Sequence, residues 1–264
     1  MANAYAVNNS ITASVAVTAD RSHAGGFTGF ASVGWGLELG TDDTTKASLL
    51  KQLTKAVTKL LSGSSNGAGE LLFIVGVNPS AILGTQMKGS FTVAAGGDYA
   101  GGLVGEGSGT VIGDSSQNRL QKLTFWKYNN RRDFPQQRST TIEGLESVTA
   151  TGSYAGGIAG NLQPTTVAGL LNSVVKIGDI AMLKKFDQFA AFTVENMSVT
   201  APASGLTVTA GSYHAGGAIG CATGGDVTHT NLTNLATVSA KGEAGGFIGF
   251  SGPGDAIGAG GLNV

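Results

Sequence analysis

The sequence is poor in cysteine, in charge and in long hydrophobic runs, and each shortage excludes a class of protein. Its 264 residues include one cysteine, Cys221, which cannot form an internal disulfide and lacks the clustered partners of a structural zinc site. Charged residues make up 12% and the net charge is -1, whereas nucleic-acid-binding proteins carry a strong basic excess. No run approaches the roughly 18 apolar residues of a membrane-spanning helix. We therefore expect no disulfide-stapled domain, no specific nucleic-acid partner and no membrane span in this chain.

Glycine is abundant instead, with 43 residues, or about one in six, against a usual share of about 7%. Collagen is excluded because glycine does not recur at every third position and only 5 prolines are present. Disorder is disfavoured because hydrophobic residues make up 41% of the chain, which gives it ample apolar surface to bury. The information in the glycines therefore lies in their positions.

Many of the glycines belong to a block of about thirteen residues that occurs five times. Each copy reads Val, then Thr, Ser or Ala, then Ala, a short polar link, Ala-Gly-Gly, a mostly large apolar residue, any residue and Gly. The first copy runs from Val17 to Gly29, and the last, one residue shorter, runs from Val238 to Gly249. The repeat glycines are Gly25, Gly26, Gly29, Gly101, Gly102, Gly105, Gly156, Gly157, Gly160, Gly216, Gly217, Gly220, Gly245, Gly246 and Gly249.

The segment before each Ala-Gly-Gly has the alternation of a strand with one buried face, as in Ile11, Val15 and Val17 between Thr, Ser and Ala. Turn residues follow, and a second short strand starts at the glycines. Such a repeat predicts an all-β fold, a parallel β-solenoid or β-helix over residues 1–264, right-handed by the usual preference of crossovers. Its rungs stack at about 4.8 Å. At a crowded corner, glycine avoids a clash and has access to positive φ.

The spacing of the five copies leaves the number of rungs open. The alanines of Ala-Gly-Gly are separated by 76, 55, 60 and 29 residues. If 29 residues make one period, the two middle gaps are close to two periods, and so is the first after a helical insertion of about 20 residues is subtracted. The intervening periods are then either degenerate rungs or excursions from the coil.

Residues 42–62 depart from the repeat and predict an amphipathic helix that lies against the solenoid or over one of its ends. Leu53, Val57 and Leu60 share one helical face, and lysines recur every four residues on another, where they form a solvated face. Residues 179–189 predict a second, weaker helix, with a bent strand as the alternative, and the apolar run at 71–77 predicts a buried strand.

Residues 119–138 form a basic and aromatic insertion, with six basic residues against one acid and a local charge of +5. Basic and aromatic side chains together bind a glycan, a phosphate backbone or a partner protein. The alternative is a surface excursion whose aromatics pack on the solenoid and whose arginines pair with acids elsewhere. The candidate binding residues are Arg119, Lys122, Phe125, Trp126, Lys127, Tyr128, Arg131 and Arg132.

The sequence predicts no catalytic residues, no metal site and no cofactor, because its reactive side chains fall on repeat positions. His23 and His214 precede Ala-Gly-Gly, where other copies have Tyr or Glu, and a position that accepts all three residue types predicts a surface position at a rung corner. Cys221 follows the repeat glycine. His229 stands alone, on an exposed strand face or in a polar turn. The densest set of acids is Asp114, Asp133, Glu143 and Glu146, and none of them recurs at rung spacing. A polysaccharide-active enzyme needs carboxylates that converge on one face, so it remains an alternative only.

Ice binding is a further alternative, since it needs a flat outward row of Thr-x-Thr pairs. Thr207 and Thr209 have this form. The equivalent pairs in the other copies mix threonine with alanine or serine, which makes the predicted row irregular.

The blocks from Tyr99 to Gly105, Tyr154 to Gly160 and Glu243 to Gly249 resemble the GLUG-type glycine repeat of large bacterial surface proteins. The resemblance covers about a quarter of the chain and implies an extracellular, non-enzymatic β-solenoid adhesin or stalk on the bacterial surface. We expect this chain to be a piece of a longer exported protein.

The leading hypothesis is a structural or adhesive module in which the repeat is a rigid scaffold and the insertions recognise a host or cell-surface protein or glycan. The alternative is a fibre subunit whose partners are other copies of itself, because an open solenoid end presents unpaired backbone groups.

Overall fold

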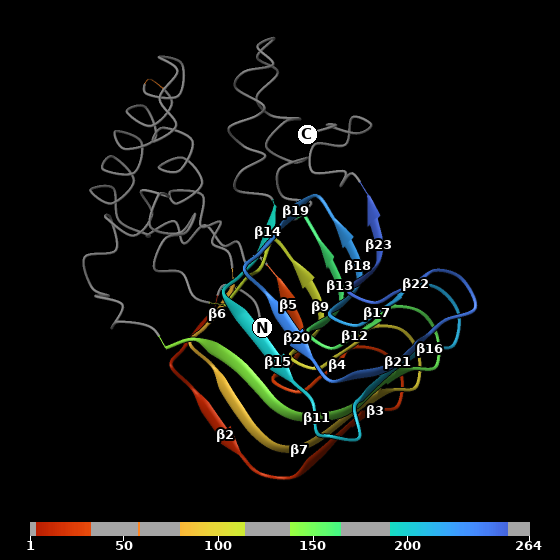
Figure 1. Ribbon diagram of the computed structural model, residues 1–264. Helices are drawn as coiled ribbons and strands as arrows, with labels where there is room; N and C mark the ends of the chain where they lie inside the picture. The colour runs from red at the N-terminus through yellow and green to blue at the C-terminus, as the bar shows by residue number, and fades with distance from the viewer. Residues whose placement is uncertain (1–3, 33–57, 59–79, 114–137, 165–190, 253–264) are drawn as a thin grey trace.

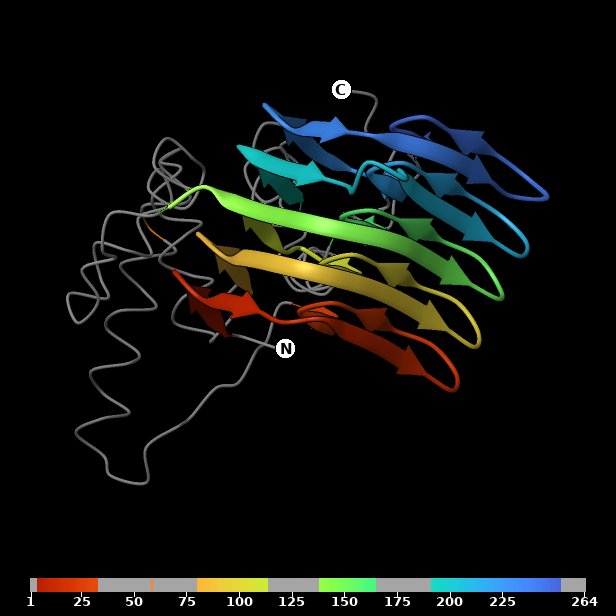
Figure 2. The same ribbon diagram turned by 60° about the horizontal axis from the view of Figure 1, so that its bottom comes forward.

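The computed structural model describes residues 4–32, 58, 80–113, 138–164 and 191–252, and apart from residue 58 the chain in these ranges winds into a parallel β-solenoid (Figure 1). Four parallel sheets run along the solenoid, and each contains strands from five successive turns of the chain. We call these turns rungs 1 to 5; they comprise β1–β5, β6–β9, β10–β13, β14–β18 and β19–β23. Figure 2 shows the rungs stacked in chain order.

Three of the sheets are narrow and one is wide. Sheet 1 consists of β1 (Tyr5–Val7), β6 (Ala81–Leu83), β10 (Val111–Gly113), β14 (Phe192–Glu195) and β19 (Gly225–Thr228). Sheet 2, the wide one, consists of β2 (Ser10–Thr12), β3 (Val15–Ala19), β7 (Gln86–Ala95), β11 (Thr140–Ala150), β15 (Met197–Thr200), β16 (Leu206–Ala210), β20 (Asn231–Thr233) and β21 (Leu235–Ser239). Sheet 3 consists of β4 (Ala24–Gly25), β8 (Ala100–Gly101), β12 (Ala155–Gly156), β17 (Ala215–Gly216) and β22 (Ala244–Gly245). Sheet 4 consists of β5 (Thr28–Ser32), β9 (Val104–Ser108), β13 (Ala159–Gln163), β18 (Ile219–Thr223) and β23 (Ile248–Gly252).

The five copies of the repeat occupy consecutive rungs. Ala24 pairs with Ala100, Ala100 with Ala155, Ala155 with Ala215 and Ala215 with Ala244. The reading of the longer gaps as two periods is therefore wrong, because each gap spans one rung. The additional residues are excursions and not degenerate rungs.

Each excursion replaces a single corner residue. From sheet 4 to sheet 1, rungs 2 and 4 turn at one left-handed glycine, Gly109 (φ 59°) or Gly224 (φ 62°). The strand registers place residues 33–79 and 164–191 at this same corner in rungs 1 and 3. From sheet 1 to sheet 2, Asn196 (φ 51°) makes the turn in rung 4, and residues 114–139 replace it in rung 3.

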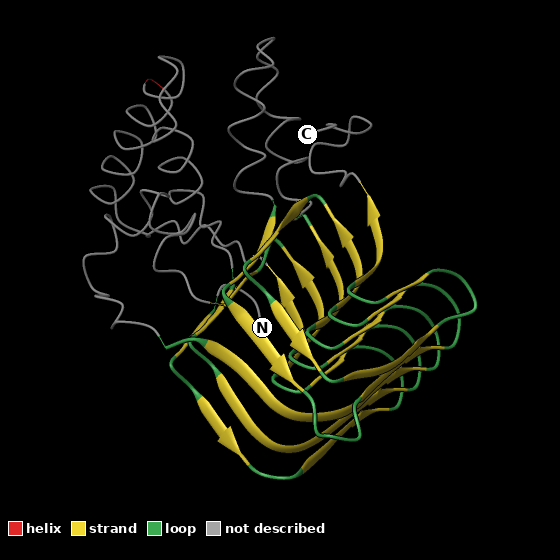
Figure 3. Ribbon diagram, viewed as in Figure 1, coloured by secondary structure: helices red, strands yellow, loops and turns green. Residues whose placement is uncertain are grey.

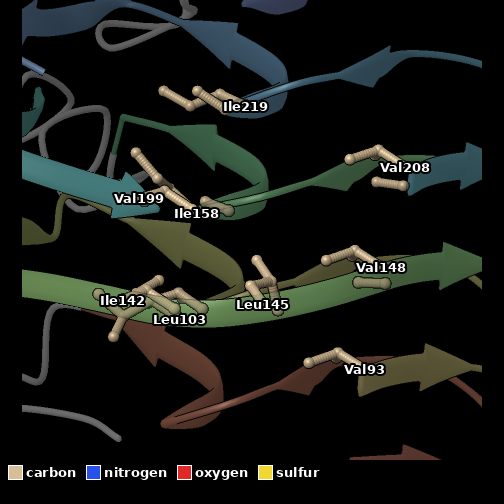
Figure 4. Packing of buried hydrophobic residues seen from close by; sticks show 14 of the residues in the cluster. Val93, Leu103, Ile142, Leu145, Val148, Ile158, Val199, Val208 and Ile219 are labelled. Atoms are coloured by element: carbon tan, nitrogen blue, oxygen red, sulfur yellow. The ribbon is translucent and has the colours of Figure 1, made fainter. Parts of the chain in front are cut away.

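The core is a set of ladders in which like residues stack from rung to rung (Figure 4). In sheet 2, the valines at one repeat position are in register along all five rungs, and those of the middle rungs are at most 1% exposed. Burial of an aliphatic side chain of this size contributes about 1.5–3 kcal/mol. The ladder consists of Val17, Val93, Val148, Val208 and Val238.

The repeat glycines are required by crowding between rungs. A Cβ at Gly157 would overlap the carbonyl oxygen of Gly217 in the next rung. The predicted positive φ does not occur at these glycines. It occurs at the residue before Ala-Gly-Gly, where His23, Tyr99 and Tyr154 have φ of 67–68°.

Figure 3 shows that the stacked part of the chain consists of strands joined by loops at the corners. The predicted helix at 42–62 lies outside the described residues apart from Thr58, and the segments at 71–77 and 179–189 lie entirely outside them. These three interpretations therefore stay predictions.

Candidate functional site

The side chains before Ala-Gly-Gly stack along one corner of the solenoid. We call this row the corner ladder; it consists of His23, Tyr99, Tyr154, His214 and Glu243. The Tyr99 and Tyr154 ring centroids are 5.1 Å apart at an interplanar angle of 4°, and the His23 ring stacks on Tyr99 at 4.8 Å. His214 Nδ1 lies 2.9 Å from Glu243 Oε2 at the other end. The predicted corner position of His23 and His214 is confirmed, whereas the predicted surface position holds only in part, because their side chains are 38% and 16% exposed.

A left-handed backbone aligns these rings. Residues other than glycine and asparagine rarely adopt positive φ, and His or Tyr does so here in four successive rungs. Each of these residues is followed by an Ala-Gly pair in sheet 3 that hydrogen-bonds to the next rung. The strain is offset because stacking and these backbone bonds hold the same conformation in every rung.

A second row runs beside the corner ladder in sheet 4. We call it the facing column; it consists of Phe30, Glu106, Asn161, Cys221 and Phe250. Its middle members are 6–7% exposed, whereas Phe30 and Phe250 at the ends are 41% and 39% exposed. The His23 and His214 rings contact the end phenylalanines at 5.5 and 4.8 Å.

Glu106 is the centre of a polar network that joins three rungs. Its Oε2 lies 2.7 Å from His23 Nε2, and its Oε1 accepts hydrogen bonds from Asn161 Nδ2 at 3.3 Å and Gln163 Nε2 at 3.0 Å. A buried carboxylate is tolerated when it is paired and hydrogen-bonded in this way. The network was missed in the sequence, although Glu106 and Asn161 share a repeat position with Cys221 and two phenylalanines, which was a usable signal.

Two tyrosines and the cysteine of these rows are held in their neutral forms. Burial, and then the charge of Glu106, raise the pKa of Tyr99 to about 12. Burial also raises the pKa of Tyr154, and it raises the pKa of the Cys221 thiol to about 11. A reactive cysteine needs a lowered thiol pKa, so Cys221 has the character of a structural residue.

The acids considered for catalysis have other partners where they are described. Glu143 Oε2 lies 3.6 Å from Lys88 Nζ, and Glu146 Oε1 accepts a hydrogen bond from Ser90 Oγ at 2.6 Å. Asp114 and Asp133 lie outside the described residues. Within the described ranges, no three His, Cys, Asp or Glu side chains are grouped so as to hold a metal ion.

The Thr-x-Thr rows exist on the outward positions of sheet 2, in the predicted register. One row consists of Ala16, Thr92, Ser147, Thr207 and Thr237. The other consists of Thr18, Ala94, Thr149, Thr209 and Ser239. The methyl and hydroxyl pattern is thus interrupted in both rows, as the sequence indicated.

The candidate binding residues of the basic insertion, Arg119 to Arg132, all lie outside the described residues. Arg138 at the end of this insertion is described and is anchored to rungs 1 and 2. Its Nη2 donates to the Asn8 carbonyl oxygen at 2.7 Å, and its Nη1 donates to Gln86 Oε1 at 3.4 Å. Arg138 therefore fixes the point at which the insertion rejoins the scaffold.

Each of the three excursions is connected at one end to a strand of sheet 1 and lies at one of the two corners that flank this sheet. Two join sheet 4 to sheet 1, and the third joins sheet 1 to sheet 2. The strands of sheet 1 have three or four residues, so the corners at the two ends of these strands are about 10–13 Å apart. The attachment points of the non-repeat segments are therefore grouped on one side of the scaffold.

No family model, no curated protein and no solved structure matches the chain. The resemblance to the GLUG-type repeat consequently depends on the motifs of the sequence and stays a prediction. In the part of the chain that the structure describes, no helix has the length and apolar character needed to cross a membrane.

Proposed function

We propose that the protein is a non-enzymatic structural and adhesive module of a bacterial cell surface. The solenoid is the rigid scaffold, and the basic insertion is the recognition element that binds an anionic glycan or an acidic protein surface. The observation that carries the proposal is that the attachment points of all three excursions are grouped at the two corners that flank sheet 1. Such an arrangement attaches the non-repeat segments close together on a rigid frame, and binding residues are often carried by loops on a rigid scaffold.

The use of the repeat side chains supports a scaffold role. The corner ladder and the facing column contact each other from rung to rung, and the carboxylate of Glu106 is surrounded by His23, Asn161 and Gln163. The pKa values of the Tyr99 hydroxyl and the Cys221 thiol are raised, which disfavours their nucleophilic forms at neutral pH. These groups stabilise the stack and leave little chemistry for substrate turnover.

The charge of the insertion supports an anionic partner. Residues 119–138 carry +5 in a chain whose total is -1, and four aromatic side chains interleave with the basic ones. Arginine and lysine pair with sulfate or carboxylate groups, and aromatic rings stack on sugar or peptide planes. Arg138 anchors the end of the segment to the scaffold at Asn8 and Gln86.

The test replaces residues 114–139 by a single asparagine, which copies the one-residue corner that Asn196 forms in rung 4. Binding is measured by surface plasmon resonance on immobilised heparin, with neutral dextran as the reference surface. We expect the intact chain to bind heparin with a salt-dependent affinity. The variant should keep its β-sheet circular dichroism spectrum and lose at least about tenfold in affinity, since several charge-assisted contacts disappear.

The matched control replaces residues 164–191 by a single glycine, which copies the corner at Gly224. This variant loses an excursion of similar size and keeps the basic one, so its affinity for heparin should match that of the intact chain. Equal binding by the 114–139 variant and the intact chain would show that the basic insertion is not the recognition element.

A further inference from the structure

The two end rungs have an incomplete core. The apolar side chains that are only partly buried against the core all belong to rungs 1 and 5. Examples are Val17 and Phe27 in rung 1, and Leu235, Val238 and Phe247 in rung 5. Their counterparts in the middle rungs are almost fully buried, as Val148 illustrates at 0% exposed. The end rungs thus have the composition of interior rungs without a neighbour among the described residues on their outer side.

Gly246 is the one repeat glycine of its position at which no described neighbour excludes a side chain. The equivalent glycines of rungs 1 to 4 are each needed, because a Cβ there would overlap the carbonyl oxygen of the corresponding glycine in the following rung. Among the described residues, a Cβ at Gly246 would meet nothing within 4 Å. Its φ is not in the left-handed region either, since it is absent from the positive-φ glycines. Glycine at this position is therefore required only when another rung lies on rung 5.

Rung 5 has backbone N–H groups at the same repeat positions from which rungs 1 to 4 donate hydrogen bonds to the next rung. In rung 1, the N–H groups of Ala24, Gly26 and Phe27 donate to carbonyl oxygens of rung 2. In rung 4, those of Ala215, Gly217 and Ala218 donate to the Glu243, Gly245 and Phe247 carbonyl oxygens of rung 5. The corresponding donors of rung 5 are on Ala244, Gly246 and Phe247, and the corresponding acceptors of rung 1 are the carbonyls of His23, Gly25 and Phe27.

We propose that a second copy of this chain stacks its rung 1 on rung 5, so that the ladders continue from one molecule into the next. The repeat register places Phe27 on Phe247, Phe30 on Phe250 and Val17 on Val238. The His23 of the added copy then lies against Glu243, which already lies 2.9 Å from His214 Nδ1 in its own chain. A carboxylate between two imidazoles gives the junction complementary polarity in addition to its apolar contacts.

This contact joins two different surfaces of the molecule, and a heterologous contact of this kind adds copies without closing a ring when the rotation does not return on itself. The product is a linear fibre. Five rungs at about 4.8 Å give an axial rise of about 24 Å per copy. The proposal is independent of what the basic insertion binds.

The test uses Gly246→Ala, because the added methyl group meets none of the described residues of its own chain and would overlap the Gly26 carbonyl oxygen of the stacked copy. We expect the intact chain to form oligomers whose mean mass rises with concentration between about 1 µM and 1 mM, as measured by light scattering and sedimentation velocity. Gly246→Ala should keep the thermal unfolding curve of the monomer and reduce association by at least tenfold. The control Gly217→Ala should lower thermal stability, since its Cβ meets the Gly246 carbonyl oxygen within the chain.

A second measurement identifies the register. Ala16 and Thr237 occupy the same outward row at opposite ends of the solenoid, so they become neighbours across the junction. Adjacent strands bring Cα atoms within the 4.4–6.8 Å range of a disulfide. The double variant Ala16→Cys and Thr237→Cys should give a ladder of covalent oligomers after mild oxidation, and neither single variant should extend beyond a dimer.

Three results would overturn the proposal. The first is a chain that stays monomeric over the full concentration range, which is also the result expected if another part of the same chain covers rung 5. The second is association that Gly246→Ala leaves unchanged. The third is a double cysteine variant that yields no ladder although the intact chain associates.

Discussion

Tyr99 illustrates how a single residue is shaped by the rung above and the rung below. Its ring lies between His23 and Tyr154, and the charge of the Glu106 carboxylate raises the pKa of its hydroxyl. Both burial and that charge disfavour the tyrosinate, so the pKa rises from 10.0 to about 12. The same crowding fixes the glycines nearby, because a Cβ at Gly102 would overlap the Gly157 carbonyl oxygen.

The raised pKa of Tyr99 makes stability depend on pH in the alkaline range. The unfolded chain loses the phenolic proton above about pH 10, whereas the folded chain retains it until about pH 12. The stabilisation is therefore complete below pH 10 and is lost as pH rises toward 12. Tyr99→Phe should show a smaller fall in the free energy of unfolding between pH 9 and pH 11, measured by urea titration. An identical fall in both proteins would contradict the assigned shift.

At the scale of elements, the facing column ties sheet 4 to the corner that precedes sheet 3. Glu106 on β9 receives hydrogen bonds from Asn161 and Gln163 on β13, and it pairs with His23 of rung 1. Three rungs thus share one buried carboxylate. Loss of such an acceptor leaves buried donors without partners, and each costs about 1–3 kcal/mol.

Glu106→Ala and Glu106→Gln separate this network from simple packing. Glu106→Ala should lower the free energy of unfolding by about 2–4 kcal/mol, because it leaves the Asn161 and Gln163 amides without their acceptor and creates a cavity. Glu106→Gln keeps an acceptor oxygen on a side chain of the same length. Its loss of unfolding free energy should be less than half that of Glu106→Ala. Urea unfolding at neutral pH measures both values, and equal losses would mean that the hydrogen bonds contribute little.

At the scale of the molecule, the excursions are separable from the stack. The corners at Gly109, Gly224 and Asn196 show that one left-handed residue closes each turn. An excursion at the same corner adds residues without changing the register of the strands on either side, as the continuous pairing of β13 with β9 and β18 demonstrates. The closure entropy of a loop rises slowly with its length, which makes long insertions tolerable at such corners.

A variant that lacks all three excursions should therefore retain the five-rung solenoid. Residues 33–79 and 164–191 are each replaced by glycine, and residues 114–139 by asparagine. We expect the variant to keep the circular dichroism spectrum of a β-sheet protein. Its urea midpoint should be no lower than that of the intact chain, since shorter loops lose less entropy on folding. A cooperative transition that disappears would show that the scaffold depends on its excursions.

The repeat alone determined the parallel β-solenoid, the inward valine ladder and the corner position of His23 and His214. These features follow from local alternation and from the crowding of identical positions, which a periodic sequence records directly. The sequence also located the segments that break the period. Residues 42–62, apart from Thr58, and residues 119–137 lie outside the described residues.

Only the tertiary structure decided the number of rungs, the positive φ at the corner ladder and the network around Glu106. The spacing between copies cannot distinguish a degenerate rung from an excursion, because both lengthen the chain equally. Strand register makes the distinction, since it places Ala100 directly beside Ala155. In the same way, Gly246 matches every other repeat glycine in sequence, and it differs only in having no rung above it among the described residues.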